Sequence, residues 1–172
     1  NKFKEVHMET NKKGTLHCLC GKIASGKSTL SKQLIEEHNA ILICEDIWLQ
    51  RLYSSEIKNF QDYLKYAEKL KTVVKPHVQE LLKMGVSVVL DYPANVPKQR
   101  LWIKEIYEEI DADHILHFLD KSDELCLKQL EKRNKEKPEG STEISVEQFN
   151  YITSFFEAPD DSEGFSVKLY KE

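Results

Sequence analysis

The sequence predicts an α/β fold, in which a mainly parallel central sheet lies between layers of helices and carries a helical lid. Three observations support this class. Short apolar runs alternate with longer amphipathic stretches, the first apolar run leads into a glycine-containing loop, and acidic residues directly follow two later runs. Strands that are separated by helices form βαβ units, so we expect right-handed crossovers and a binding site at the carboxyl ends of the strands.

The first half of the chain contains two expected strands and two expected helices. Residues 15–20 are an apolar run typical of a buried strand, and residues 27–38 follow with apolar positions at helical spacing. Residues 40–44 form a second short apolar strand. The stretch 59–84 keeps its apolar side chains on one face, which predicts a long helix, and Gly85 ends it.

The same alternation continues in the second half. Residues 86–90 are apolar enough for a central strand that is covered on both faces. Residues 97–110 predict a helix with proline in its first turn, and residues 114–119 a fourth strand. Residues 122–134 predict a helix that opens with Ser-Asp-Glu, and the charged run 135–142 contains proline and glycine, which indicates a loop.

The C-terminal part completes the expected domain. Residues 145–156 predict a last helix, and residues 165–170 alternate as an edge strand does. The length of 172 residues fits one domain over 1–172. Within it we expect a polar tail over 1–13 and a lid region over about 129–145.

Composition and charge limit the function classes. The formal net charge of −4 does not favour a nucleic-acid-binding surface, and no apolar run approaches the roughly 18–20 residues of a membrane span. The four cysteines have no metal-binding spacing, so we expect buried free thiols and a cytoplasmic protein. The six histidines are spread along the chain, and we assign none a metal or catalytic role. The expected assembly is a monomer or a weak homodimer.

The segment Gly21–Ser28 matches the pattern Gly-x-x-x-x-Gly-Lys-Ser/Thr of a phosphate-binding loop, or P-loop. Its glycines let successive backbone N–H groups turn toward phosphate oxygens, and the loop opens into a helix whose dipole adds positive potential. Lys27 is expected to reach the β- and γ-phosphates of ATP, and Ser28 to bind Mg²⁺. The alternative is a glycine-containing turn without a ligand. The expected nucleotide-binding residues are Gly21, Ile23, Ala24, Ser25, Gly26, Lys27, Ser28 and Thr29. With this loop, the fold class becomes the three-layer P-loop NTPase fold.

Two acidic residues follow apolar strands and are expected beside the P-loop. Asp91 ends the third strand at the Walker B position, where an acid holds Mg²⁺, and its alternative role is a turn or a helix cap. Asp46 follows the second strand and is a candidate base for the proton of an attacking hydroxyl. The alternatives are that Asp46 caps a helix or that Glu45 is the base. We expect both aspartates to contact substrate.

Three arginines are candidates for the charged groups that phosphoryl transfer needs. Arg133 ends the helix before the charged loop, where a closing lid would carry it across the nucleotide, so we expect a catalytic role. A solvated cation at a helix C-terminus is the alternative. Arg100 and Arg51 are expected to bind substrate, with a surface position as the alternative for each.

Aromatic residues gather in the sequence near the expected acceptor side. Packing within the core or the lid and stacking on a substrate ring both fit this group, and the sequence leaves the choice open. Its members are Trp48, Tyr53, Phe60 and Tyr63.

These motifs together resemble the P-loop kinases of the polynucleotide-kinase and zeta-toxin type, and more narrowly bacterial proteins described as AAA-family ATPases or ATP-binding proteins. The resemblance covers nearly the whole chain, from Thr15 to Phe165. It implies a central parallel sheet, an ATP site and a hinged lid. By the resemblance, Lys27 falls on the nucleotide position, Ser28 on the metal position and Asp46 on the general base. Asp91 and Arg100 fall on the third-strand motif and its following arginine, and Arg133 falls on the lid arginine.

The sequence departs from polynucleotide kinases at positions that bind nucleic acid in that group. Leu49 stands where they carry an arginine, and Gln129 stands at a second basic position of the lid. The third-strand motif continues with Pro93 and Ala94. The leading hypothesis is therefore an ATP-dependent kinase, with Mg²⁺, that acts on a hydroxyl group of a small molecule. The alternatives are an ATPase switch that acts through a protein partner and a polynucleotide 5′-hydroxyl kinase.

Overall fold

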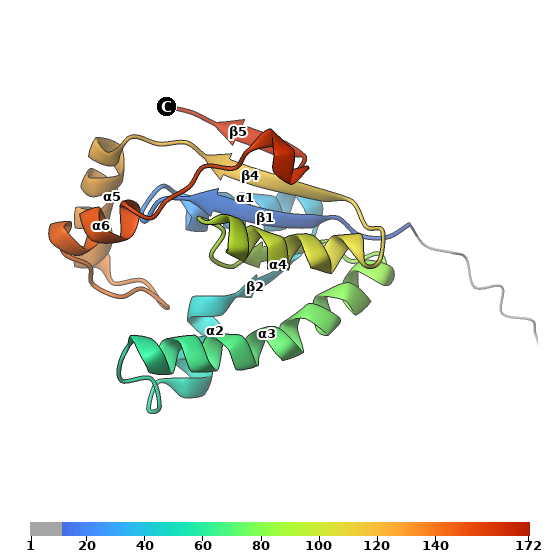
Figure 1. Cartoon of the computed structure of the whole chain (residues 1–172), viewed down its shortest axis with the longest axis horizontal. Helices are drawn as coiled ribbons and strands as arrows, with labels where there is room; N and C mark the ends of the chain where they lie inside the picture. The colour runs from blue at the N-terminus through green and yellow to red at the C-terminus, as the bar shows by residue number, and fades with distance from the viewer. Residues whose placement is uncertain (1–11) are drawn as a thin grey trace, which may run out of the picture.

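One parallel sheet organises the molecule. The structure is a computed structural model that describes residues 12–172. Its strands follow the order β2-β3-β1-β4-β5, and every neighbouring pair is parallel (Figure 1). The prediction of a mainly parallel sheet is confirmed, and so is the position of the last strand at an edge. The strands are β1 Leu16–Gly21, β2 Ile41–Cys44, β3 Val88–Asp91, β4 His114–Leu119 and β5 Val167–Tyr170.

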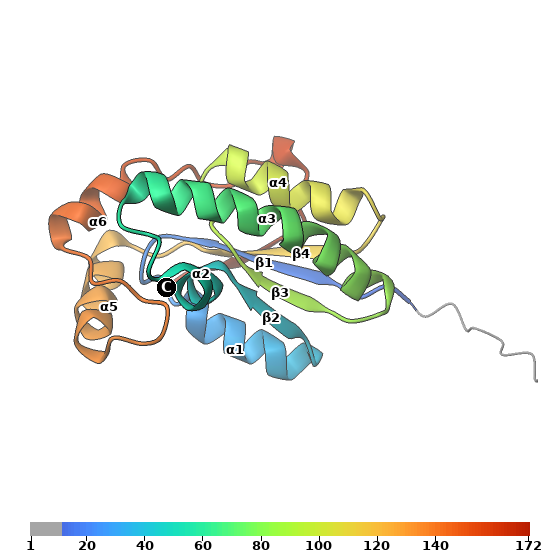
Figure 2. The same cartoon turned by 90° about the horizontal axis from the view of Figure 1, so that it is seen from below.

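Helices cover both faces of the sheet, as a three-layer fold requires. Figure 2 shows α1 on one side of the strands and α3 with α4 on the other. The helices α5 and α6 lie together beyond the carboxyl ends of the strands (Figures 1 and 2). The bounds are α1 Lys27–His38, α2 Glu45–Tyr53, α3 Phe60–Lys83, α4 Pro97–Glu108, α5 Asp123–Glu136, α6 Val146–Thr153 and a 3₁₀ turn, η1 Asp161–Glu163.

The alternation of side chains along β1 separates two parts of the core. Cys18 and Cys20 pack toward α3 and α4, whereas Leu19 packs with α1 residues on the opposite face. All residues of β1 are buried, because a central parallel strand is covered on both faces. The α3 side chains that complete the larger core recur every three or four residues: Ala67, Leu70, Val74, Val78 and Leu82.

Several boundaries match the expected ones, and others differ, among them the helix α2, which was not an expected element. The helix over 27–38 and the strand over 114–119 have the predicted limits. The helix expected over 145–156 ends at Thr153, and η1 was not expected. The tail expected over 1–13 lies outside the described residues except for its last two, and the domain limits stay a prediction. Within residues 12–172, no helix has the length and apolar composition to cross a membrane.

Three histidines that are far apart in the sequence meet beside the sheet. His17 Nδ1 lies 2.9 Å from His117 Nε2, and the rings of His17 and His38 are 4.4 Å apart between centroids. His117 Nδ1 lies 2.8 Å from the hydroxyl of Tyr170 on β5. Burial is the main reason why the pKa of both His17 and His117 is lowered to about 4. The nearby His38 and Lys168 lower both pKa values further, and His17 also lowers the pKa of His117. The sequence spacing gave no indication of this cluster.

Candidate active site

The P-loop runs from the end of β1 to the start of α1 and requires glycine at two positions. A Cβ atom on Gly21 would lie 2.5 Å from Ser25 Oγ and 3.2 Å from the Leu119 backbone oxygen. Gly26 precedes α1 with a φ of 102°, in the left-handed region that side chains disfavour. The loop therefore curls tightly, as the motif predicts. Its nucleotide-binding role stays a prediction.

Lys27 lies folded across this loop. Its Nζ atom donates hydrogen bonds to the backbone oxygens of Gly21 at 2.6 Å and of Lys22 at 2.8 Å. Burial lowers the pKa of Lys27, and the nearby Asp91 carboxylate opposes that change. The cation is thus held where the loop turns, close to an acidic residue of β3.

The two candidate aspartates occupy the ends of neighbouring strands. Asp91 is the last residue of β3, and its carboxylate accepts a hydrogen bond from the Cys44 thiol at 3.6 Å. Asp46 lies in the first turn of α2, which begins directly after β2. The N-cap residue of α2 is Cys44 and that of α4 is Val96, so neither aspartate caps a helix. Both carboxylates line the same cavity.

The charges around Asp46 set its protonation. Removal from bulk water raises the pKa of Asp46, and the Asp91 carboxylate raises it further. Lys27 and Arg133 lower it, although less strongly. Asp46 is exposed at the cavity wall, so its carboxyl group loses only part of its contact with water. The Asp46 carboxyl group therefore interacts with one acidic residue, Asp91, and with two cations, those of Lys27 and Arg133.

Arg133 faces this group from the last turn of α5. Its Nε atom is buried and has no hydrogen-bond partner among residues 12–172. Burial lowers the pKa of Arg133, and the Asp46 carboxylate raises it. A solvated helix-end cation would lie away from the cavity, but Arg133 lines the cavity that holds both aspartates.

Arg100 does not line this cavity, and its expected role in substrate binding stays a prediction that its surroundings do not support. The side chain is only 1% exposed. Its Nε and Nη2 atoms donate to the Glu163 carboxylate at 2.7 and 2.8 Å, and Nη1 donates to the backbone oxygens of Ala94 and Glu157, each at 2.9 Å. Arg100 thus joins the C-terminal segment around Glu157 and Glu163 to the loop after β3 through hydrogen bonds.

Arg51 also lies elsewhere than expected. Its exposed side chain donates from Nε to the Glu139 carboxylate at 2.6 Å, and it does not line the cavity of the two aspartates. The adjacent Gln50 accepts a hydrogen bond from the backbone of Gly140 at 2.8 Å. These contacts join α2 to the loop after α5, which belongs to the expected lid region, and the substrate role of Arg51 stays a prediction.

Sequence reasoning missed Asn95, which connects three segments. Its Oδ1 atom accepts the backbone N–H of Gly21 at 3.0 Å, and its backbone oxygen accepts the N–H of Glu157 at 2.9 Å. Its own N–H donates to Gln99 Oε1 at 2.9 Å. An asparagine in the turn after the Asp91 strand was the available indication, because Asn side chains commonly bond backbone groups in turns.

Glu45 differs from its neighbour Asp46 in having a partner. The hydroxyl of Tyr63 on α3 donates to the Glu45 carboxylate at 2.6 Å. Burial raises the pKa of Glu45 to about 7, and the Tyr63 hydrogen bond limits the rise. The carboxylate is fixed by α3, whereas Asp46 points into the cavity.

Two adjoining cavities surround the P-loop. The P-loop cavity, of about 660 Å³, is lined by the loop, the two aspartates, Arg133 and four residues of the expected lid region: Pro138, Gly140, Ser141 and Thr142. The α5 cavity, of about 530 Å³, lies between α1 and α5. The two cavities share Gly26, Thr29, Gln129 and Arg133. A ligand can therefore extend from one to the other past the start of α1.

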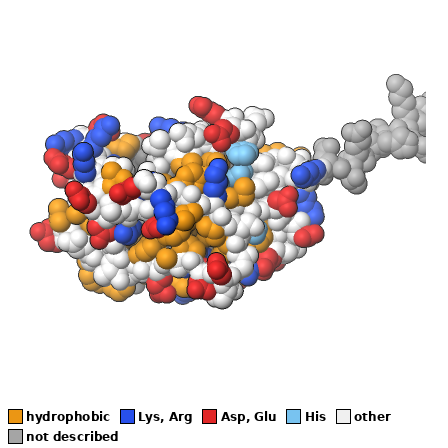
Figure 3. Space-filling model, turned by 90° about the horizontal axis from the view of Figure 1, so that it is seen from above, with side chains coloured by type: hydrophobic (Ala, Val, Ile, Leu, Met, Phe, Trp, Pro, Cys, Tyr) orange, Lys and Arg blue, Asp and Glu red, His pale blue; other side chains and the backbone are white. Residues whose placement is uncertain are grey.

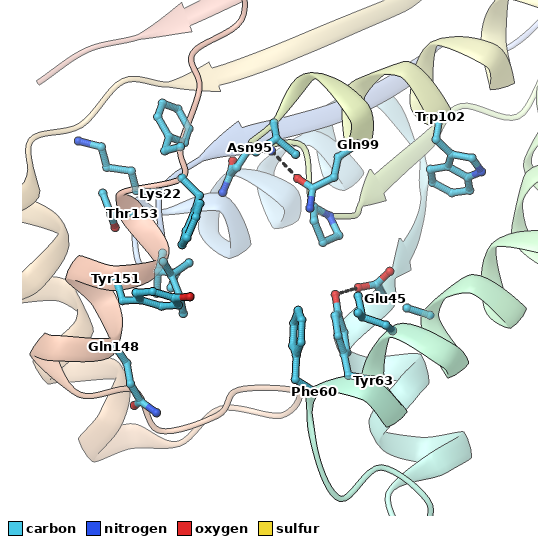
Figure 4. Close-up of a pocket in the computed structure, with 18 of the residues that line it drawn as sticks. Lys22, Glu45, Phe60, Tyr63, Asn95, Gln99, Trp102, Gln148, Tyr151 and Thr153 are labelled. Atoms are coloured by element: carbon cyan, nitrogen blue, oxygen red, sulfur yellow. Dashed lines mark hydrogen bonds between the residues drawn. The ribbon is translucent and has the colours of Figure 1, made fainter.

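A third cavity adjoins the P-loop cavity on its other side. This side cavity, of about 790 Å³, lies between α3, α4 and α6 (Figure 4). The lining residues that it shares with the P-loop cavity are Ile23, Glu45, Phe60, Tyr63, Pro93, Asn95 and Ile152. It shares no lining residue with the α5 cavity, so the P-loop cavity is the central one of three.

The oxygen atoms at the P-loop suit a Mg²⁺ ion. Ser28 and Asp91 supply a hydroxyl and a carboxylate to one cavity, and hard cations prefer such ligands. Residues 12–172 contain no group of three His, Cys, Asp or Glu side chains that could hold a metal. Mg²⁺ needs no such group where substrate phosphates complete its coordination.

The chain matches a protein family and several solved structures. The model of the AAA_33 family, described as an AAA domain, matches residues 16–159. A protein from Chloroflexus aurantiacus that is proposed to be a kinase is similar, with a TM-score of 0.72 and 14% identity over 93% of this chain and 86% of that one. APS kinase CysC of Mycobacterium tuberculosis, in complex with AMPPNP and APS, gives 0.61 and 17% over 92% and 88%. A sugar kinase from Janibacter sp. HTCC2649 gives 0.61 and 15% over 92% and 85%.

At these identities the structural likeness establishes the fold, which is that of P-loop NTPases. No curated protein matches the sequence. The finer resemblance, to the polynucleotide-kinase and zeta-toxin type, stays a prediction. Because the family model spans most of its length, this chain belongs to the AAA_33 family of AAA domains.

Proposed function

We propose that this chain is an ATP-dependent phosphotransferase, which moves the γ-phosphate of ATP to a hydroxyl group of a small molecule. One observation carries the proposal. Asp46, the candidate base, interacts with Asp91, Lys27 and Arg133 in a single cavity at the P-loop. Phosphoryl transfer needs both a group that receives the hydroxyl proton and cations beside the transferring group.

The proposed reaction transfers one proton and one phosphoryl group. The acceptor hydroxyl gives its proton to Asp46, and the acceptor oxygen uses that electron pair to bond the γ-phosphorus. The bond between the γ-phosphorus and the β–γ bridging oxygen breaks, and its electron pair stays on ADP. Asp46 suits the base because its raised pKa lies closer to neutral pH. Lys27 and Arg133 stabilise charge on the phosphoryl oxygens and the leaving group.

The nucleotide is proposed to extend from the P-loop into the α5 cavity. Backbone N–H groups of the loop would bind the phosphates, and Ser28 and Asp91 would hold Mg²⁺. When bound, this ion neutralises phosphate charge. The similar APS kinase structure, which contains AMPPNP and APS, supports an ATP-type nucleotide.

A small-molecule acceptor is favoured over nucleic acid. Leu49, at the position of the arginine in polynucleotide kinases, is 3% exposed and packs in the core. Figure 3 shows one face of the molecule, on which the described Lys and Arg side chains are interspersed with Asp and Glu rather than joined into a basic surface. A chain of phosphates would find no continuous path of cations on this face.

An ATPase switch is the second candidate, and one observation favours it. The lid loop is joined to α2 by the exposed Arg51–Glu139 ion pair and the Gln50–Gly140 hydrogen bond. Exposed pairs of this kind contribute little stability, so the lid can open at small cost. A switch would hydrolyse ATP and change its lid contacts, without transferring phosphate to a soluble acceptor.

The cytoplasmic location stays part of the proposal. The four cysteines are buried and free, as expected for a reducing compartment. The monomeric or weakly dimeric state stays a prediction.

Isothermal calorimetry with ATP and Mg²⁺ tests the nucleotide site. Lys27→Ala should weaken ATP binding by at least about 100-fold, since it removes the cation of the loop. Lys32→Ala, at an exposed position of α1 outside the three cavities, is the matched control and should bind ATP as the unmodified chain does. Equal ATP affinity of the Lys27→Ala variant would refute the site.

A further inference from the structure

The side cavity is distinguished by aromatic walls. Phe60 and Tyr63 of α3 and Tyr151 of α6 point into it from opposite sides, and Trp102 of α4 also lines it (Figure 4). Phe60, Tyr151 and Phe155 are more than half exposed, which is unusual for three large side chains around one cavity. The remaining apolar lining comes from Ile23, Leu64, Ala67, Pro93, Val96, Ile152 and Phe156.

The size of the side cavity suits a small molecule. Its volume of about 790 Å³ lies within the range of roughly 300–1,000 Å³ that is typical of small-molecule sites. Polar side chains also line the cavity, and Glu45, Tyr63 and Asn95 among them belong to the wall that it shares with the P-loop cavity. The polar groups include the Tyr63 hydroxyl and the amides of Asn95 and Gln99, which can orient a hydroxyl group (Figure 4).

The charged residues of this cavity already have partners. Lys22 Nζ lies 2.6 Å from the Asp123 carboxylate, and Lys71 Nζ lies 2.9 Å from the Glu68 carboxylate. The Glu45 carboxylate accepts a tyrosine hydroxyl. These are all the charged side chains that line the cavity, so a charged ligand would have to compete with an existing partner at each of them.

The arginines of the chain are no better placed to bind an anion here. Arg100 is occupied by Glu163, Arg51 pairs with Glu139, and Arg133 lines the other two cavities. None of the three lines the side cavity. Recognition of a phosphate or carboxylate commonly uses such a fork of N–H donors, so an anionic acceptor is disfavoured.

The side cavity opens toward the proposed base. It shares the wall of Glu45, Phe60 and Tyr63 with the P-loop cavity, and Asp46 follows Glu45 directly on α2. A molecule with its ring in the side cavity can thus present a hydroxyl group to Asp46 past the Tyr63 side chain.

We infer that the side cavity is the acceptor pocket and that the acceptor is an uncharged small alcohol bearing an aromatic or alicyclic ring. This inference rests on the proposed phosphotransferase function and names its substrate class. The aromatic walls supply ring contacts, and the paired charges select against acceptors that carry a net charge.

Ring binding can be measured without any turnover. In a Trp48→Phe variant, Trp102 is the remaining tryptophan of the chain, and it lines the side cavity. Quenching of its fluorescence by 3-phenyl-1-propanol should give a dissociation constant at least about tenfold lower than that of 3-phenylpropanoate. The two probes share a ring and a chain and differ mainly in charge.

A blocking variant identifies the cavity. Leu64→Arg places a bulky cation on the cavity wall, at a position that is 40% exposed and therefore tolerant of the change. The Leu64→Arg variant should bind the alcohol at least about tenfold more weakly. Val73→Arg, 63% exposed on the same helix and outside the cavity, is the control and should leave the alcohol affinity unchanged. A carboxylate that binds as tightly as the alcohol, or a Leu64→Arg variant without effect, overturns the inference.

Transfer from labelled ATP separates this inference from the function it rests on. With ring-bearing alcohols, label should appear on the alcohol, fall at least about tenfold with Leu64→Arg and persist with Val73→Arg, while ATP affinity stays constant. Faster transfer to anionic acceptors, or an unchanged transfer rate in the Leu64→Arg variant, would overturn the proposed acceptor class. Neither result would contradict the proposed phosphotransferase function. Unchanged ATP affinity in the Lys27→Ala variant would instead refute the proposed function. The Trp102 fluorescence measurement would then test only whether the side cavity binds ring-bearing alcohols.

Discussion

The hydroxyl of Tyr63 on α3 donates a 2.6 Å hydrogen bond to the carboxylate of Glu45, the first residue of α2. The pair forms part of the wall between the P-loop cavity and the side cavity. It connects the start of α2, which carries Asp46, to α3, which lines the side cavity. It also leaves Asp46, one residue later, free to face the P-loop.

Glu45 should give the folding stability a characteristic pH dependence. Its pKa is about 7 in the folded chain and 4.5 in an unfolded reference, so the folded state holds a proton that the unfolded state loses. The unfolding free energy should therefore fall as pH rises from 4.5 to 7, by about 3 kcal/mol from this residue. Denaturant titrations at several pH values measure this fall, which Glu45→Gln should remove.

The control for this experiment is Glu36→Gln, at an exposed position of α1. It removes one carboxylate of the same type and should leave the pH profile unchanged. Parallel profiles for Glu45→Gln and the unmodified chain would show that Glu45 is ionised like an exposed carboxylate.

The histidine cluster should produce the opposite trend at lower pH. His17 and His117 have a pKa of about 4 in the folded chain, below the ordinary 6.5, so the unfolded chain takes up protons first. Stability should fall as pH decreases from 6.5 to 4, and His117→Gln should reduce the slope by at most about 1.4 kcal/mol per pH unit. The exposed His77→Gln variant is the control. Acid unfolding that is identical in both variants would exclude a contribution from the cluster.

Arg100 should matter for stability and not for nucleotide binding. Arg100→Met leaves the Glu163 carboxylate without its paired cation and should lower the unfolding free energy by about 3–5 kcal/mol. ATP affinity, measured well below the melting temperature, should stay within about twofold. Lys104→Met removes a cation that donates to the Glu163 backbone oxygen and pairs with the exposed Glu108, and it should cost less. A selective loss of ATP affinity in a stable Arg100→Met variant would restore the substrate role.

Asn95 should support the P-loop through its side chain. Asn95→Ala removes the acceptor of the Gly21 N–H and should cost about 1–3 kcal/mol of stability and weaken ATP binding. Asn95→Asp keeps the acceptor and should restore stability, but its negative charge should keep ATP affinity low. Calorimetry and thermal melting distinguish these effects, and wild-type ATP affinity in Asn95→Ala would contradict them.

The sequence predicted elements whose causes are local. The helix over 27–38 follows a motif and keeps one apolar face, Asp91 ends β3, and Asp46 lies two residues after the end of β2. Such features need only the neighbouring residues. Their proximity follows from a parallel sheet, in which all strands end at the same edge.

Features that depend on distant partners were missed or mistaken. Arg100 is held by Glu163, which lies 63 residues later, and His17 meets His117 across 100 residues. Arg51 faces outward because the lid loop supplies Glu139. The spacing of apolar residues in the sequence does not indicate which distant residues will pair, because these contacts depend on how separate helices and strands pack together.

Single-turnover transfer with the Asp46→Asn variant tests the central claim most directly. The assay follows label from ATP to a ring-bearing alcohol, beside a calorimetric measurement of ATP affinity, with Glu45→Gln as the matched control. We predict that Asp46→Asn binds ATP normally and transfers label at least about 100-fold more slowly, whereas Glu45→Gln transfers at a rate near that of the unmodified chain. Transfer by Asp46→Asn at the unmodified rate, or release of free phosphate alone from the unmodified chain with every acceptor, would contradict the account.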